Sequence, residues 1–219
     1  MKLYDTKTAP NPRRVRIFLA EKGVDVPTVQ VDIAGKENRS SPYIDKNPLG
    51  GVPMLELDDG TIIAESVAIC RYFEEVQAEP PLMGIDAEDK ALVEMWNRRM
   101  EHNLALPVMN SFRHTHEFFA SRIPQVPEFG ANSKMEALTR MAWLDGELAE
   151  REFIAGDRFT IADITALVGI DFGRVTKIGI GDDQTNLRRW HDAVSGRPSA
   201  RPISGGRMPL TALSSSGSR

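Results

Sequence analysis

The chain has 219 residues, a length that fits one or two domains, and its 41% hydrophobic and 26% charged residues are typical of a globular protein. A formal net charge of −4 argues against a dedicated nucleic-acid-binding protein, which needs a basic face to neutralise phosphates. The single cysteine, Cys70, cannot form an internal disulfide and suits a reducing compartment. No apolar run reaches the roughly 18–20 residues that span a bilayer. Asp5 comes too early for a signal peptide, so we expect a soluble cytoplasmic protein without a membrane partner.

The first third of the chain predicts short strands that alternate with helices. Residues 2–4 are extended, and the breaker-rich turn at residues 8–12 precedes a helical apolar stripe. Residues 28–33 alternate as a strand with three apolar side chains on one face. Two further strands flank the turn at residues 58–60, which indicates a hairpin, and a helix follows. This order predicts a small sheet with helices packed on it.

The rest of the chain predicts helices alone. Two adjacent prolines in residues 79–84 indicate a linker, because proline interrupts a helix interior. A long helix that Pro107 bends, a helix over residues 134–150 and a largely buried central helix around Ile164 follow. The fold class is therefore α/β followed by all-α. The expected parts are a small α/β domain at residues 1–79, an all-helical domain at residues 86–200 and a flexible tail at residues 201–219.

Three motifs, in order along the chain, carry a resemblance to a known family. Residues 47–55 read NPLGGVPML, residues 63–69 read IAESVAI and residues 159–164 read FTIADI. They are similar to the NPxGxVPxL, ESxAI and helical-domain motifs of the cytosolic glutathione transferases. The resemblance implies a thioredoxin-like N-terminal domain, glutathione as a substrate and a homodimer, and it covers the chain up to about residue 200. It implies no metal.

Val52 and Pro53 are the first pair of candidate glutathione-binding residues. By the resemblance, their peptide bond is cis, which only an X–Pro linkage adopts at low cost. The N–H and C=O of Val52 then pair with the cysteinyl backbone of glutathione as an added strand would. The alternative is that Pro53 only begins an edge strand.

Glu65 and Ser66 are the second pair, at the transition from a strand to a helix. The free N–H groups of a helix N-terminus suit the γ-glutamyl carboxylate, and the Ser66 hydroxyl can add a hydrogen bond. Glu65 supplies a charge opposite to that of the adjacent ammonium group. The alternative is helix capping, which does not exclude binding.

Residues 160–163, TIAD, have a structural interpretation instead. Thr160 and Asp163 are spaced as a capping box, and Phe159 and Ile164 are placed as a hydrophobic staple. Loss of the cap is expected to cost about 1 kcal/mol of stability without affecting the chemistry.

Stabilisation of the glutathione thiolate is the least defined part of the site. The turn at residues 6–13 contains no Tyr, Ser or Cys, the residues that the family usually places there. The first helix N-terminus remains, since its dipole and free N–H groups stabilise a thiolate. Asn11 can donate its amide to the sulfur or can serve as the helix N-cap, and Thr8 offers a hydroxyl.

His114 is a third catalytic candidate. The turn and residues 113–116 are similar to a fungal and bacterial branch of the family that lacks the usual Tyr, Ser or Cys. That likeness places His114 over the thiol, with Ser111 or His116 as alternatives to it. Surface histidines on a helix are the competing interpretation. His114 and His116 are two residues apart and point to different helix faces, which argues against zinc.

The leading functional hypothesis is a glutathione transferase that adds the thiolate to small, apolar electrophiles in detoxification. The acceptor pocket is expected between the domains, lined by the first turn and by Met109 and Phe112. The alternative is a transferase-like glutathione-binding or stress-response scaffold without turnover. Cys70 is expected to be a buried apolar residue. The arginines at positions 13, 14 and 16 are expected to form a solvated face that helps to attract an anionic tripeptide.

Overall fold

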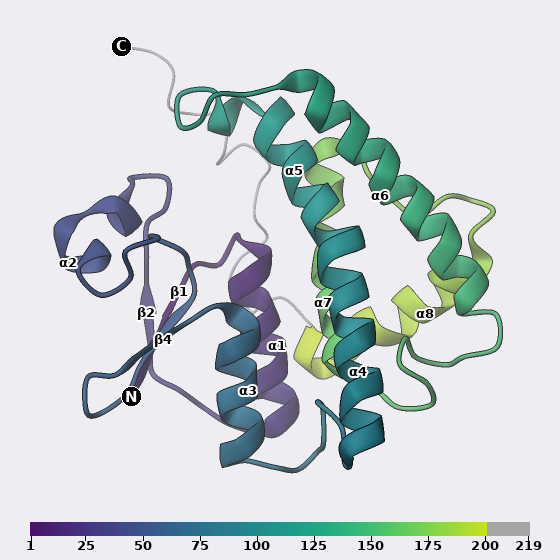
Figure 1. Ribbon diagram of the computed structural model, residues 1–219, viewed down its shortest axis with the longest axis horizontal. Helices are drawn as coiled ribbons and strands as arrows, with labels where there is room; N and C mark the ends of the chain where they lie inside the picture. The colour runs from purple at the N-terminus through teal and green to yellow at the C-terminus, as the bar shows by residue number, and fades with distance from the viewer. Residues whose placement is uncertain (201–219) are drawn as a thin grey trace.

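The computed structural model describes residues 1–200, in which a small sheet and its helices pack against a helical domain (Figure 1). The predicted tail at residues 201–219 lies outside the described residues. The four strands lie in the order β2-β1-β3-β4. Their bounds are β1 Lys2–Asp5, β2 Thr28–Gln30, β3 Met54–Glu56 and β4 Ile62–Ala64. β1 and β2 are parallel, whereas β3 pairs antiparallel with both of its neighbours. The predicted hairpin is confirmed.

Side chains alternate between the two faces of the sheet, because successive residues of a strand point to opposite sides. On one face, Leu3 and Leu55 are buried against α1 (Pro10–Lys22) and α3 (Ser66–Val76). On the other face, Met54 packs with Val31 and Tyr43 under α2 (Ser41–Ile44). Of the three apolar residues predicted on one face of residues 28–33, Val31 is buried, whereas Val29 of the short edge strand is 37% exposed.

The helical domain surrounds one buried helix. Its helices are α4 (Ala87–Met100), α5 (Leu106–Thr115), α6 (Pro127–Glu147), α7 (Ile161–Gly173) and α8 (Thr185–Ser195). Eleven of the 13 residues of α7 are buried, as predicted for the central helix. At Gly169, a Cβ atom would lie 3.0 Å from the Cβ of Ala105, so a glycine lets the crossing segment approach closely.

Two helix boundaries differ from the prediction. The long helix continues from α4 to α5 through the π-helical segment η2 (Glu101–Ala105). This segment precedes Pro107, which has no N–H to continue the ordinary hydrogen-bond ladder. α6 begins at Pro127 rather than near residue 134, because proline fits the first position of a helix, where no intrahelical N–H bond is made.

The capping box of α7 is confirmed. The side chain of Thr160 accepts a hydrogen bond from within the first turn, and Asp163 accepts one from the backbone N–H of Thr160. Asp163 is fully buried and also accepts from the Ile154 N–H and the Trp190 indole, at 2.9 and 2.8 Å. Burial raises the pKa of Asp163, and these donors oppose that rise. The carboxylate therefore joins α7 to α8 in addition to capping α7.

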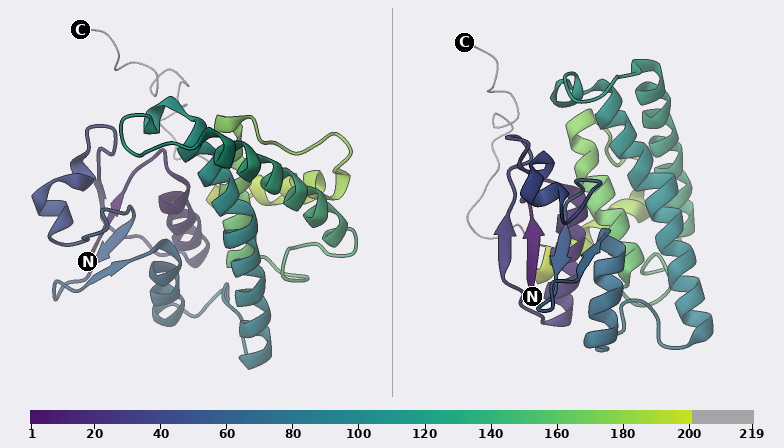
Figure 2. Two further views of the ribbon diagram at one scale, coloured as in Figure 1. Left: turned by 45° about the horizontal axis from the view of Figure 1, so that its top comes forward. Right: turned by 60° about the vertical axis from the view of Figure 1, so that its left-hand side comes forward.

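The two domains pack through α1 and α7, so that α1 and α3 lie between the sheet and the helical domain (Figures 1 and 2). Arg13 of α1 pairs with Asp171 of α7, and Glu21 of α1 pairs with Arg197 after α8. The expected solvated arginine face is wrong. Arg14 is 1% exposed, and Arg13 and Arg16 are half-buried in ion pairs. Within residues 1–200, no helix is long and apolar enough to cross a membrane.

Candidate functional site

Three sequence-predicted segments lie at the same end of the sheet. In the register of the strands, Met54 of β3 faces Tyr4 of β1 and Ala64 of β4. β1 runs out of the sheet into the turn that leads to α1, β3 enters just after Pro53, and β4 ends just before Glu65. Since β3 is antiparallel to both neighbours, all three connections emerge at this edge. The topology therefore brings together the first turn, Val52–Pro53 and Glu65–Ser66.

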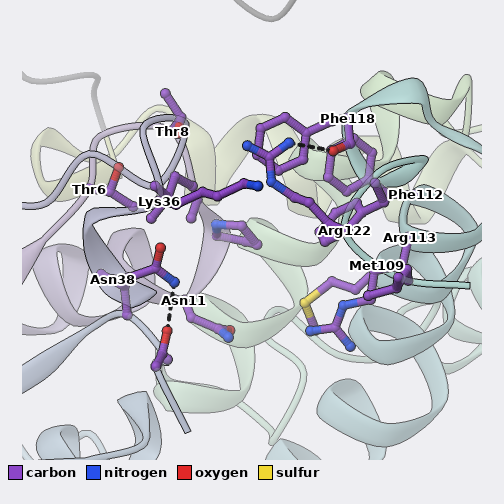
Figure 3. Close-up of a pocket in the computed structure, with 18 of the residues that line it drawn as sticks. Thr6, Thr8, Asn11, Lys36, Asn38, Met109, Phe112, Arg113, Phe118 and Arg122 are labelled. Carbon is purple, nitrogen blue, oxygen red and sulfur yellow. Dashed lines mark hydrogen bonds between the residues drawn. The ribbon is translucent and has the colours of Figure 1, made fainter. Parts of the chain in front are cut away.

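A cavity of about 940 Å³ lies between the two domains at this edge (Figure 3). The N-terminal domain contributes Thr6, Thr8, Ala9, Pro10, Asn11, Ile33, Lys36, Asn38, Arg39 and residues 49–52. The helical domain contributes Met109, Phe112, Arg113, Phe118, Phe119, residues 121–123 and Phe172. Thr8, Asn11 and Val52, as well as the expected acceptor residues Met109 and Phe112, therefore lie around one space.

At the N-terminus of α1, Asn11 is the one residue among the first three of the helix that has a main-chain N–H. Ala9 is the N-cap and makes no side-chain capping bond, while Pro10 and Pro12 have no N–H. Asn11 lies between them, inside the helix, so the alternative that it is the N-cap is excluded. Its side-chain Oδ1 accepts a 3.3 Å hydrogen bond from Arg14. That bond leaves the Nδ2 group as the donor available to the cavity.

The Val52–Pro53 peptide bond is cis, as the sequence predicted. Within residues 1–200, neither the N–H nor the C=O of Val52 has a hydrogen-bond partner. The preceding carbonyl of Gly51 is held by the Tyr43 hydroxyl and the Asn47 amide, at 2.6 and 2.8 Å. Burial raises the pKa of Tyr43 to about 12, so this hydroxyl stays a donor at neutral pH. These two hydrogen bonds fix the backbone just before Val52, so its free N–H and C=O have a defined position.

Glu65 and Ser66 lie at the start of α3, outside the residues that line the cavity. Glu65 is exposed and has a φ of +67°, a backbone conformation that non-glycine residues seldom adopt and that clusters at ligand sites. Ser66 is buried, and its hydroxyl accepts a 2.6 Å hydrogen bond from Arg14. Sequence reasoning missed Arg14, which thereby contacts both Asn11 and Ser66.

Arg14 is a buried cation behind these two candidates. Its guanidinium lies 3.5 Å from the carboxylate of Glu101, on the π-helical segment of the other domain. Desolvation lowers the pKa of Arg14, and the charge of Glu101 opposes that effect. No sequence pattern distinguished Arg14 from its neighbours Arg13 and Arg16, which are half-buried and pair with Asp171 and Asp5. Its position on the α1 face that packs against α3 and the helical domain explains its burial.

The wall contributed by the helical domain is aromatic. Phe112 of α5 is its centre, and its ring lies 5.1 Å from Phe172, 5.3 Å from Phe119 and 6.2 Å from Phe118 between centroids. The Phe172 and Phe119 contacts are edge-to-face and the Phe118 contact is stacked, which are favourable geometries for aromatic rings. Phe118 and Phe119 belong to η3 (Glu117–Phe119). This wall suits a planar apolar molecule.

Cations surround the cavity, and sequence reasoning did not find them. They are Lys36, Arg39, Arg113 and Arg122, and no aspartate or glutamate of the described residues lines the same space. Arg122 donates to the carbonyls of Phe118 and Ala34, so it joins the two domains across the cavity. Lys36 precedes and Arg39 ends the short segment η1 (Glu37–Arg39), Arg113 lies on α5, and Arg122 follows η3. Only the three-dimensional fold shows that they converge.

His114, the third catalytic candidate, does not line the cavity. Its Nδ1 accepts a 3.0 Å hydrogen bond from the Val126 N–H, and its ring packs edge-on against Phe129, 5.0 Å away. The alternatives to it are not in the lining either. Ser111 is buried, and the Nδ1 of His116 accepts from the Phe118 N–H. The side chain of Arg113, next to His114, reaches the cavity instead.

Neither metal nor cysteine chemistry has support within residues 1–200. No three His, Cys, Asp or Glu side chains in that range are grouped so as to hold a metal ion. Cys70 lies on the buried face of α3, as expected for an apolar role, and burial raises its pKa to about 12. It does not line the cavity.

Comparison with known proteins agrees with this geometry. The family model described as "Glutathione S-transferase, N-terminal domain" matches residues 1–75, and the C-terminal domain model matches residues 99–198. Glutathione S-transferase 2 of Saccharomyces cerevisiae is 36% identical over 207 residues, which cover 93% of this chain and 89% of the yeast protein. Among solved structures, a glutathione S-transferase domain-containing protein of Marinobacter aquaeolei is 43% identical with a TM-score of 0.89. That match covers 92% of this chain and 100% of the other. The structure of Gtt2 from S. cerevisiae gives 37% identity and a TM-score of 0.87, over 91% of this chain and 98% of the yeast chain.

Proposed function

The chain belongs to the glutathione S-transferase family, and from that premise we propose that its interdomain cavity joins glutathione to small planar electrophiles. The observation that carries this proposal is the convergence of the first turn, Val52 and Glu65–Ser66 at one sheet edge, opposite an aromatic wall. One side suits the tripeptide and the other suits an apolar acceptor. Such a site holds two reactants together, which by itself accelerates their reaction.

Glutathione is held along the sheet edge in this proposal. The free N–H and C=O of Val52 pair with the cysteinyl main chain, in the manner of an added strand. The N-terminus of α3 and the Ser66 hydroxyl take the γ-glutamyl carboxylate, with the buried Arg14 behind them. Glu65, which is exposed and close to the same position, pairs with the ammonium group. Lys36 and Arg39 then lie on the side left for the glycyl carboxylate.

The thiolate lies against the N-terminus of α1. A free thiol titrates near pH 8.5, so lowering its pKa by about two units requires about 3 kcal/mol of preferential stabilisation of the thiolate. The Asn11 N–H, its Nδ2 group and the helix dipole all favour negative charge there. Thr8 is a second possible donor. The thiol proton passes to solvent, and the thiolate forms a carbon–sulfur bond as the leaving group departs with its electron pair.

The test is conjugation of glutathione to a chloronitroarene, with glutathione binding measured separately by calorimetry. We expect saturable binding, and turnover that depends on the enzyme. Binding without turnover would favour the alternative function of a glutathione-binding or stress-response scaffold. Absence of both would contradict the proposed function. Turnover unaffected by Glu65→Ala would contradict the placement of the ammonium group.

A role in detoxification, a cytoplasmic location and a homodimer remain predictions. The apolar acceptor wall supports the first, because reactive apolar molecules are the substrates that such a wall would bind. The lone cysteine is consistent with the second. Fractionation of native cells tests the location. Sedimentation velocity tests the homodimer, which predicts a species with about twice the chain mass of 24.3 kDa.

A further inference from the structure

Arg113 is a cation on the acceptor side of the cavity. It lies on α5, one residue after Phe112 and one turn after Met109, and it is exposed. Among residues 1–200, its guanidinium has no hydrogen bond and no ion pair. Figure 3 shows the guanidinium beside the Met109 side chain, facing the wall that carries Asn11. Five N–H donors therefore face a space bordered by aromatic rings.

The other cations of the cavity have different surroundings. Arg39 donates to the Leu49 carbonyl at 3.1 Å, and Arg122 is bound to the Phe118 and Ala34 carbonyls. Lys36 and Arg39 belong to the N-terminal domain, where the proposed placement of glutathione puts its glycyl carboxylate near them. Arg113 belongs to the helical domain instead, next to Phe112 of the aromatic wall. The proposed glutathione placement supplies no carboxylate on the Arg113 side.

We propose that Arg113 makes the acceptor site selective for planar electrophiles that carry a carboxylate. This inference rests on the proposed function and names the substrate class of the same site. The aromatic wall of Phe112, Phe118 and Phe172 takes the ring of such an acceptor. The planar guanidinium pairs with the carboxylate in a bidentate geometry, which an uncharged acceptor cannot match. The absence of acidic residues from the described cavity lining lets its positive field concentrate anionic acceptors.

The reaction leaves the carboxylate unchanged. With 4-chloro-3-nitrobenzoate as the probe, the glutathione thiolate attacks the ring carbon that carries chlorine. The carbon–sulfur bond forms, the carbon–chlorine bond breaks, and chloride leaves with the bonding electron pair. No oxidant or reductant takes part. Arg113 contacts the group on the far side of the ring, so it sets specificity and orientation without touching the reacting atoms.

The first experiment compares 4-chloro-3-nitrobenzoate with its uncharged carboxamide. We expect Arg113→Gln to lower kcat/KM for the benzoate by about tenfold, since a charge-assisted hydrogen bond of this kind contributes about that factor. The carboxamide should change little, and Arg113→Lys should recover part of the benzoate activity. Arg174→Gln is the matched control, because Arg174 is also exposed and lies outside the cavity lining. An equal loss for both acceptors, or no loss, would overturn the inference.

Two further measurements separate the possible causes of failure. The ultraviolet absorbance of bound thiolate, titrated against pH, should be the same in Arg113→Gln and in the wild type. A raised thiol pKa in the variant would instead assign Arg113 to thiolate stabilisation and overturn the inference. Calorimetry with the two synthetic conjugates needs no turnover. If the wild type binds the carboxylate conjugate no better than the carboxamide conjugate, the inference fails while the proposed function stands. If glutathione and both conjugates fail to bind, the proposed function fails.

Discussion

The orientation of Asn11 depends on a buried neighbour. Arg14 donates to the Oδ1 atom of Asn11 and to the Ser66 hydroxyl, so one guanidinium supports both the proposed thiolate donor and the proposed γ-glutamyl site. Because Arg14 is a donor only, the amide of Asn11 must direct its oxygen toward Arg14 and its NH₂ group away from it. Arg14 therefore determines that the NH₂ group of Asn11, and not its oxygen, is directed toward the cavity.

Asn11→Ala should therefore raise the pKa of the bound glutathione thiol. The variant loses the Nδ2 donor while the helix dipole remains, so we expect kcat/KM at neutral pH to fall by about tenfold and the pH profile to move upward. Thiolate absorbance against pH measures the shift. Asn132→Ala, at an exposed position on α6, is the control and should change neither quantity. An unchanged pKa in Asn11→Ala, together with a raised one in Thr8→Val, would assign the donor to Thr8.

Glu65→Gln tests the charge of Glu65 without changing the length of its side chain. Because residue 65 adopts the uncommon φ of +67°, a change in side-chain size there could alter the local backbone. Glutamine keeps the size of the side chain, so this substitution tests the charge alone. We expect KM for glutathione to rise by about tenfold and kcat to stay within about twofold, because the lost ion pair acts on binding. Glu75→Gln, on an exposed position at the other end of α3, should have no effect. A fall in kcat with KM unchanged would contradict the role assigned to Glu65.

At the scale of elements, the α7 capping box has a larger role than its sequence indicates. The spacing of Thr160 and Asp163 predicts a helix cap, whereas the structure adds the Ile154 N–H and the Trp190 indole as donors to the same carboxylate. A sequence cannot show these two contacts, because residue 190 lies on another helix. Asp163 thus fixes the packing of α8 as well as the start of α7.

Thr160→Ala and Asp163→Asn should consequently differ in cost. The threonine variant loses the capping hydrogen bond from the Ala162 N–H and the bond that its hydroxyl donates to Asp163, and we expect the free energy of unfolding to fall by about 1 kcal/mol. The asparagine variant directs an NH₂ group at buried donors, and we expect a loss of about 3 kcal/mol. Urea unfolding measures both, and calorimetric affinity for glutathione in the folded variants should be unchanged. Equal costs would mean that the additional donors contribute nothing.

The helix pattern predicted which elements exist better than it predicted where they begin. Apolar periodicity located α7 and α8, since burial of one face or of the whole helix determines which residues are apolar. It placed the start of α6 seven residues too late, because Pro127 looked like a loop residue and proline also begins helices. His114 illustrates the same limit. Adjacent residues of a helix point in different directions, and on α5 it is Arg113, not His114, that lines the cavity.

At the scale of the whole molecule, the site residues that the sequence predicted are those next to the ends of the strands. Val52 and Glu65 flank consecutive strands of one hairpin, so their motifs and the strand order together placed them at one edge. Lys36 is distant in sequence from Arg113 and Arg122, and it meets them only when the domains dock. Each is an ordinary surface-type residue in its own segment. Their role follows from the docking of the domains and could not be predicted from any local pattern.

That docking relies on ion pairs between α1 and the end of the helical domain. Asp171 accepts from Arg13 and from His191, and Glu21 accepts from Arg197 and Ser199. Burial alone would raise the pKa of each carboxyl, yet their hydrogen bonds and the adjacent arginines hold both below the ordinary range. An acid whose pKa is depressed by folding stabilises the native state above the pKa of the unfolded chain. Its contribution disappears as the pH falls through the folded-state pKa.

The two carboxyls should therefore contribute a constant stability from about pH 7 to pH 5, and a decreasing one below about pH 4, where the unfolded chain begins to bind the protons. We expect Glu21→Gln combined with Asp171→Asn to lower the free energy of unfolding by about 2 kcal/mol at pH 7. The difference from the wild type should shrink as the pH is lowered toward 3. Urea unfolding at several pH values measures it, with Glu136→Gln and Glu150→Gln, both exposed, as the control pair. A difference that stays constant down to pH 3 would show that these carboxylates stabilise the domain contact by packing rather than by charge.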